Sequence, residues 1–89
     1  MKIKLELFGA SRDFSDNDHL DIEIRDKASV DDLRNEIIKY LDKNFKGNEA
    51  FIRIVNSSAF CSENNEIISD NYKITKDQKI GIIPPIGGG

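Results

Sequence analysis

The chain has 89 residues, 38% hydrophobic and 33% charged, which is the composition of one folded domain with a small core. The formal net charge of −3 leaves no basic stripe to bind nucleic acid, and no apolar run approaches the ~20 residues that a membrane-spanning helix needs. We therefore expect a single-domain protein that binds neither nucleic acid nor a membrane.

Two alternating segments near the start of the chain predict strands. In residues 2–7, KIKLEL, and residues 20–24, LDIEI, apolar side chains alternate with charged ones, which is the period of a half-buried strand. The segment GASRD at 9–13 predicts a loop, and the polar residues 15–18 suit the connection of a hairpin.

The next segment has the periodicity of a helix, which we place at about residues 29–46. Ser29 and Asp32 have the spacing of a capping box, and Gly47 is a stop signal at the far end. The apolar residues of this segment fall on one helical face: Val30, Leu33, Ile37, Leu41 and Phe45. This face is the side that we expect to pack on a sheet.

The second half of the chain predicts a third strand and a last strand. AFIRIVNSS, residues 50–58, restores a strand pattern that ends in a turn at Asn56, and KIGII, residues 79–83, predicts the last strand. The stretch between them, 60–78, is irregular and rich in turn formers. One helix must cover one face of this mixed sheet, because nothing else can bury its apolar stripe. The sequence thus predicts an α+β roll whose first and last strands lie side by side near the centre.

The chain offers few side chains for catalysis or metal binding. Its single histidine, His19, and single cysteine, Cys61, cannot supply the ligands of a tetrahedral zinc site. We expect His19 to be a solvated polar residue and Cys61 to be a small buried hydrophobe. One cysteine also excludes an internal disulfide and fits a reducing cytoplasm, where we expect the protein to reside.

The candidate for chemistry is the end of the chain, PPIGGG. Pro84 and Pro85 cannot donate to a sheet ladder, so they should stop the last strand and direct the tail outward. Ile86 offers one apolar anchor, and the glycines that follow can enter a passage too narrow for side chains. Fully extended, the four last residues reach roughly 13 Å at ~3.3 Å per residue. The candidate reactive group is then the carboxylate of Gly89.

Three segments together carry a family resemblance: PPIGGG at 84–89, LFGASRD at 7–13 and ASVDDLRNEI at 28–37. They resemble, respectively, the ending, the stretch after the first strand and the helix start of the MoaD and ThiS sulfur carriers. These carriers are relatives of ubiquitin with the β-grasp fold, and the second and third segments are closest to the MoaD branch. Three places depart from the family pattern: the turn at 56–57, the residues 76–78 before the last strand, and the isoleucines 82–83 before the prolines.

The resemblance implies a β-grasp domain over residues 1–85, a flexible Gly-Gly tail at 86–89, and the role of the small subunit of molybdopterin synthase. In that family a partner uses ATP and magnesium to adenylate the terminal carboxylate. A sulfur donor then converts it to a thiocarboxylate, which supplies sulfur for the molybdopterin dithiolene. The implied partners are a MoaE-like large subunit, a MoeB-like adenylyltransferase related to ubiquitin-activating enzymes, and the sulfur donor. The carrier itself binds no cofactor, and the catalytic side chains belong to its partners.

The resemblance makes Gly89 the reacting residue, with Gly87 and Gly88 in the passage that admits the tail. We expect an apolar partner surface beside the tail, formed by Phe8, Ile82, Ile83, Pro84, Pro85 and Ile86, with Arg12 making a polar contact. Two other functions fit the same ending. The protein could be a ubiquitin-like modifier conjugated through its last glycine, alone or besides carrying sulfur for this or another pathway. It could also be a plain binding module with an inert tail.

Overall fold

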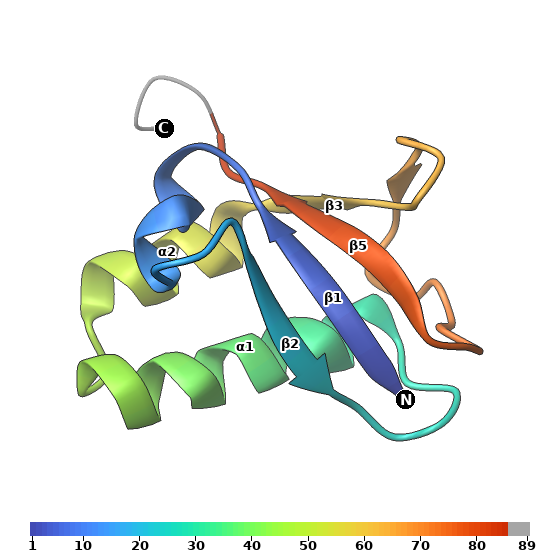
Figure 1. Ribbon diagram of the computed structural model, residues 1–89, viewed down its shortest axis with the longest axis horizontal. Coiled ribbons are helices and arrows are strands. Elements are labelled where there is room, and N and C mark those ends of the chain that lie inside the picture. The colour runs from blue at the N-terminus through green and yellow to red at the C-terminus, as the bar shows by residue number, and fades with distance from the viewer. Residues whose placement is uncertain (86–89) are drawn as a thin grey trace.

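The computed structural model describes residues 1–85 of the 89-residue chain, and within them a five-stranded sheet in the order β2-β1-β5-β3-β4. The strands are β1 (Lys2–Leu7), β2 (His19–Glu23), β3 (Ala59–Cys61), β4 (Ile67–Ile68) and β5 (Gln78–Ile83). The helices are the 3₁₀ helix η1 (Gly9–Phe14), α1 (Val30–Phe45) and α2 (Glu49–Ser57). Figure 1 shows α1 running across the sheet, as the predicted β-grasp roll requires. The residues predicted to form the Gly-Gly tail, 86–89, lie outside the described part.

The first and last strands form the centre of the sheet, as predicted. β1 and β5 are parallel, with Leu5 opposite Ile80 and Leu7 opposite Ile82. β2 and β3 flank this pair, each antiparallel to its neighbour. Parallel neighbours need a long crossover connection, and the segment that carries α1 and α2 supplies it.

Helix α1 begins and ends as its sequence predicts. The Ser29 hydroxyl accepts a hydrogen bond from the Asp32 N–H at 3.2 Å, and the Asp32 carboxylate accepts one from the Ser29 N–H at 2.9 Å. These two bonds form the predicted capping box. At the other end the backbone turns left-handed at Lys46 and Gly47, with φ of 54° and 69°. The helix therefore ends at Phe45, with Lys46 as its C-cap, directly before the glycine that marks its end in the sequence.

The predicted face of α1 packs into the core. Val30, Leu33, Ile37 and Leu41 are fully buried, whereas Phe45 is partly buried and packs against the same cluster. The sheet contributes the alternate residues of its strands to this core: Ile3, Leu5, Leu7, Leu20, Ile22, Phe60, Ile80 and Ile82. One apolar layer between helix and sheet thus holds the domain together.

The prediction of a strand at residues 50–58 is wrong, because this segment is helix α2. The Asn48 side chain accepts hydrogen bonds from the N–H groups of Ala50 and Phe51 at 3.0 and 3.2 Å, which starts a helix. Phe51, Ile54 and Val55 have the i, i+3, i+4 spacing of a buried helical face, whereas Ile52 and Ile54 alternate as they would in a strand. The stretch expected to be irregular, 60–78, contains most of β3, which starts at Ala59, and all of β4. The predicted loop at 9–13 is η1.

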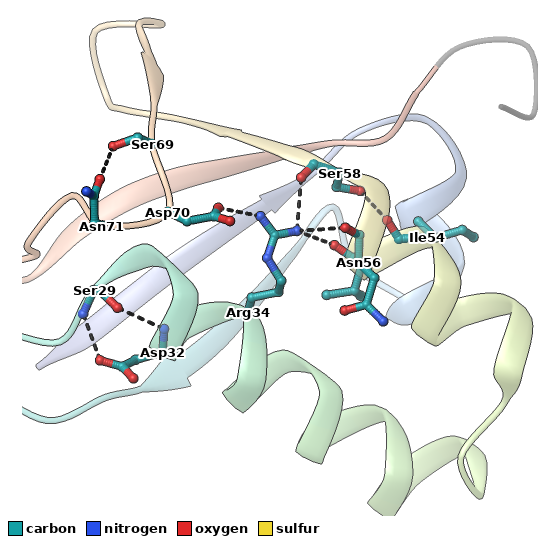
Figure 2. A network of polar contacts seen from close by, with 10 residues as sticks. Ser29, Asp32, Arg34, Ile54, Asn56, Ser58, Ser69, Asp70 and Asn71 are labelled. Carbon is teal, nitrogen blue, oxygen red and sulfur yellow. Dashed lines mark hydrogen bonds and ion pairs between the residues drawn. The ribbon is translucent and has the colours of Figure 1, made fainter.

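A buried arginine on α1 fixes the end of α2 (Figure 2). The Arg34 guanidinium donates to the carbonyl oxygens of Val55 and Ser58 at 2.6 and 3.0 Å. It also pairs with the Asp70 carboxylate at 2.6 Å and lies 4.9 Å from the centre of the Phe60 ring. Carbonyls at a helix end lack partners within the helix, so a cation placed there stabilises that end. Arg34 thereby joins α1, α2 and β3, and no periodicity in the sequence indicates this contact.

Ile37 tests the core face of α1. Replacing this fully buried side chain by alanine removes apolar contacts and leaves a cavity, so Ile37→Ala should lower the free energy of unfolding by ~2–5 kcal/mol. Chemical denaturation followed by circular dichroism measures the change. The exposed Asn35→Ala on the same helix is the matched control and should change stability little. A loss near zero for Ile37→Ala would contradict the assigned face.

Asp32 tests the capping box through pH. The hydrogen bond from the Ser29 backbone N–H lowers the pKa of Asp32 below its ordinary value of 3.8. A carboxylate whose pKa is lower in the folded state stabilises the fold above its ordinary pKa, and this contribution is lost as pH falls through the folded value. Asp32→Asn should therefore show a smaller fall in melting temperature than the wild type between about pH 5 and about pH 2. The charge-matched Asp31→Asn should keep the wild-type slope, and equal slopes for all three proteins would contradict the assignment.

Candidate functional site

The candidate site lies where β5 ends. Because β1 and β5 are parallel, their carboxyl ends meet at the same edge of the sheet. Phe8 and η1 follow β1 there, and Pro84 and Pro85 follow β5 (Figure 1). The sheet thus brings the start of the predicted tail next to the LFGASRD segment, although the two lie at opposite ends of the sequence.

Pro84 packs beside Gly9. The backbone of Gly9 has a φ of 55°, a left-handed conformation that favours glycine. A Cβ built on Gly9 would lie 3.9 Å from both Cδ and Cγ of Pro84, which is ordinary contact distance. Pro84 is buried and Pro85 is exposed. β5 ends at Ile83, directly before the prolines, as the sequence predicts.

Short hydrogen bonds fix the turn between β1 and η1. The Ser11 hydroxyl accepts a hydrogen bond from the Phe8 N–H at 3.0 Å and donates one to the Phe8 carbonyl at 2.6 Å. At the end of η1 the Tyr40 hydroxyl donates to the Phe14 carbonyl at 2.8 Å, and the Phe14 ring is fully buried. η1 is therefore attached to the body of the protein at both ends, and Phe8 leaves β1 in a defined direction.

The ring of Phe8 covers Gly81 on the outer face of the sheet, opposite the helices. A Cβ on Gly81 would lie 2.9 Å from Cε2 of Phe8 and 2.8 Å from Sγ of Cys61, closer than real side chains approach. Glycine at 81 thus leaves the space that the ring and the thiol occupy. Cys61 is buried in this contact, as predicted for a small hydrophobe.

An apolar patch on the outer face surrounds this contact. Cross-strand partners share a face of a sheet, and the pairs here are Ala59 with Ile83 and Cys61 with both Gly81 and Ile67. The outer apolar patch therefore consists of Phe8, Ala59, Cys61, Ile67, Gly81 and Ile83. Its large members are exposed, at 37% for Phe8, 67% for Ile67 and 36% for Ile83. The same face carries charge farther from the prolines, where Lys79 and Glu6 form an ion pair of 3.3 Å.

The expected partner surface needs two corrections, because Pro84 is buried beside Gly9 and Ile82 lies in the core. Ile82 is fully buried and points into the core, so its side chain cannot meet a partner. Adjacent residues of a strand face opposite sides, and Ile83 therefore takes the exposed position while Ile82 packs inside. The side chain of Arg12 is exposed on η1, so its contact with a partner stays a prediction. Ile86 and the glycines at 87–89 lie outside the described residues.

Sequence reasoning missed Ala59 and Ile67 as members of the patch. Ala59 lies between the predicted strand at 50–58 and the irregular stretch at 60–78, and Ile67 lies within that stretch. The positions of both follow from the short strands β3 and β4. Once β3 is placed, alternation puts Ala59 and Cys61 on one face and Phe60 on the other. The alternation of residues 59–61 is visible in the sequence, but the wrongly predicted strand at 50–58 left no place for a strand directly after it.

The described residues hold no cluster built for metal chemistry. Within residues 1–85 no group of three histidine, cysteine or acidic side chains is placed to hold a metal ion. His19 is partly exposed at the start of β2 and lies 3.0 Å from the exposed Asp18 carboxylate. The hydrogen bond with His19 lowers the pKa of Asp18.

Within residues 1–85, no helix is long and apolar enough to cross a membrane.

Comparison with known families decides what this fold and ending belong to. The model of the ThiS family matches residues 5–89, which is nearly the whole chain and includes the last glycines. The chain belongs to the ThiS family. It is accordingly a ubiquitin-like protein of the MoaD/ThiS sulfur-carrier type, as the three sequence segments predict. A comparison with curated proteins gave no match.

Two solved structures share the fold over their whole length. SAMP1 from Haloferax volcanii has a TM-score of 0.68 and 14% identity, with all of both chains covered. A candidate molybdopterin converting factor, subunit 1, from Pyrococcus furiosus has a TM-score of 0.69 and 25% identity, and the alignment covers 96% of this chain and 98% of that one. The first likeness shows the fold alone. The β-grasp class predicted from the sequence is confirmed.

Gly81 tests the contact that forms the outer apolar patch. Gly81→Ala puts a methyl group where Phe8 and Cys61 pack, and such overpacking should cost about 1–3 kcal/mol in the free energy of unfolding. Combining it with Cys61→Ala removes the closest clash, so the double variant should be more stable than the sum of the single effects predicts. Denaturation of all four proteins of this cycle measures the coupling. Strictly additive effects would contradict the assigned contact.

Proposed function

We propose that the protein is a sulfur carrier whose Gly89 carboxylate is converted to a thiocarboxylate, and that it serves as the small subunit of molybdopterin synthase. The observation that carries the proposal is the ThiS-family match, which runs through Gly89. The likeness to the Pyrococcus furiosus protein supports the choice of molybdopterin synthesis among the pathways that use such carriers.

The carboxylate of Gly89 is a poor electrophile, so it must be activated before sulfur can be added. In the proposed first step a carboxylate oxygen of Gly89 attacks the α-phosphorus of ATP, and pyrophosphate leaves. The resulting acyl adenylate has AMP as a good leaving group. A sulfur donor at the oxidation level of sulfide then attacks the acyl carbon, AMP leaves, and the thiocarboxylate remains. The carrier then docks in the large subunit, where the sulfur of its thiocarboxylate is transferred to a pterin precursor to build the dithiolene.

The proposed partners supply what the carrier lacks. A MoeB-like adenylyltransferase would bind ATP and magnesium, and a MoaE-like large subunit would bind the pterin precursor. The acids and bases of both reactions would then be residues of the partners. We place these reactions in the cytoplasm, where ATP is available. The carrier contributes a chain end that is small enough to enter each active site and a surface that holds it there.

The outer apolar patch suits that surface. It lies beside the prolines that precede the tail, and Phe8, Ile67 and Ile83 expose apolar area to solvent. A stable interface buries on the order of 800 Å² per partner, which is more than the four last residues can provide. Holding an extended segment in a cleft costs about 1–2 kcal/mol per residue in backbone entropy. Contacts of the patch would offset this cost while chemistry proceeds at Gly89.

A ubiquitin-like modifier is the second candidate, because adenylation of a terminal glycine also precedes conjugation to a lysine. The glycine ending fits both fates equally. Intact mass distinguishes them: a carrier gains the mass difference between sulfur and oxygen, whereas a modifier forms covalent ladders with other proteins in a cell lysate.

Deleting Gly88 and Gly89 tests the proposed reacting end. The truncated protein should fail to be adenylated, because its carboxylate no longer reaches the nucleotide. Its melting temperature should stay almost unchanged, because the buried core lies within residues 1–85. Gly88→Ala and Gly89→Ala add a methyl group in the narrow passage, and a displacement of about 1 Å at the reacting carbon should slow the reaction on the order of a hundredfold.

The assay incubates each variant with the cognate activating enzyme, ATP, magnesium and a sulfur donor, and mass spectrometry reads the product. Asp26→Asn, an exposed change at the opposite end of the sheet, is the control and should react like the wild type. If the truncated form still gained sulfur, or still complemented a strain deficient in the cofactor, the sulfur-carrier proposal would be wrong.

A further inference from the structure

Strand β2 leaves one side of its backbone without a partner strand. Among the strands of residues 1–85 it is the first in the sheet order and pairs with β1 alone, as Figure 1 shows. The Ile24 N–H donates to the Met1 carbonyl and the Leu7 N–H to the Asp18 carbonyl, each at 2.9 Å. Since hydrogen-bonded positions alternate along an antiparallel ladder, the N–H and C=O groups of residues 19, 21 and 23 point away from the sheet. They are available to a further strand.

The opposite edge of the sheet offers far less. β4 has two residues, whereas β2 has five. Short edge strands are one way in which proteins avoid unwanted pairing, and β2 is not protected in this way. An added strand would therefore form more backbone hydrogen bonds at β2 than at β4.

A groove follows β2 on the side of the helix. Two hollows of about 930 and 500 Å³ lie between β2 and α1, and they share Glu23, Glu36 and Lys39 in their walls. Leu20 and Ile22, which line the second hollow, remain 9% and 8% exposed, in contrast to the 0–1% of the core residues on β1. The wall on α1 is polar, with Glu36, Lys39 and Lys43, so apolar side chains of a strand laid along β2 would contact the floor of the groove at Leu20 and Ile22.

The outer side of β2 is acidic. Asp21 and Glu23 project there, opposite Lys4 and Lys2 of β1, and within residues 1–85 neither carboxylate lies close enough to a side chain for an ion pair or a side-chain hydrogen bond. Opposite charges on neighbouring strands contribute favourably, and like charges directly opposite each other are destabilising. β1 already places lysines opposite these two carboxylates, and a strand on the free side of β2 should repeat this arrangement with basic residues on its outer face.

From these features we propose that β2 binds an extended segment of a partner protein that alternates basic and apolar residues. The segment extends the sheet through the free backbone groups of residues 19, 21 and 23. Its basic side chains lie over Asp21 and Glu23, and its apolar side chains enter the groove beside Leu20 and Ile22. This contact is distinct from the outer apolar patch and does not depend on the chemistry of Gly89.

A second copy of the chain fits this edge poorly. If the two copies of β2 overlap fully in an antiparallel pair, Asp21 lies opposite Asp21 of the other copy. A shift of two residues towards Glu23 places Asp21 opposite Glu23. Both arrangements bring like charges together, whereas a shift in the other direction would place His19 opposite Asp21. The carboxylates therefore disfavour the two registers that overlap β2 most at Asp21 and Glu23, and a basic partner avoids this repulsion in every register.

The test adds a capped peptide that alternates lysine and valine, with the length of β2, to the full-length protein. Amide hydrogen exchange by NMR should show new protection at His19, Asp21 and Glu23, with Leu20 and Ile22 unchanged because they already bond to β1. A peptide with glutamate in place of lysine should give no protection. The Asp21→Asn/Glu23→Gln variant should bind the basic peptide about threefold to about tenfold more weakly.

The Asp13→Asn/Glu66→Gln variant is the charge-matched control, since both residues are exposed and lie outside β2, and it should bind like the wild type. The proposal is overturned if the basic peptide gives no protection at millimolar concentration, or if the affected amides surround Phe8 and Ile83. It is equally overturned if the amides of β2 are already protected without peptide and sedimentation shows that the chain is a dimer.

Discussion

The parallel pairing of β1 with β5 is the constraint on which the rest of the structure depends. Two parallel neighbours cannot be joined by a tight turn, so the chain between them must leave the sheet, cross it as α1 and α2, and return. The crossing buries one face of the sheet and leaves the other open. The same pairing places the ends of both strands together, which brings Phe8 and Gly9 beside Pro84. The folded core and the candidate site therefore have one origin.

The two faces of the sheet have different tasks because successive residues of a strand point in opposite directions. On β5 the inward Ile80 and Ile82 fill the core, whereas Gly81 and Ile83 face outward. The outward set is apolar near the prolines and charged farther away, where Lys79 pairs with Glu6. An apolar surface thus lies next to the chain end, and charge marks its boundary. This arrangement supports a carrier that docks beside its tail and leaves the chemistry to its partners.

The prediction from sequence succeeded where local signals agreed with the final fold. The capping box of Ser29 and Asp32, the apolar face of α1 and the alternation of β1, β2 and β5 all appear in the structure. It failed at residues 49–57, where apolar spacing suited either a strand or a helix. There the Asn48 cap and the contacts of Arg34 with the end of α2 favour the helix. The missing helix displaced the third strand and hid Ala59 and Ile67 from the predicted patch.

The sequence by itself determined the mixed α+β class, the position of α1, the end of β5 at the prolines and the family to which the ending points. These features depend on residues close together in the chain, where period, caps and proline act directly. Tertiary structure alone decided that Ile82 is inside and Ile83 outside, that Phe8 covers Gly81 and Cys61, and that β2 is a free edge. Each of these depends on which strands become neighbours, and that choice is made by contacts between residues far apart in the sequence, which no local pattern encodes.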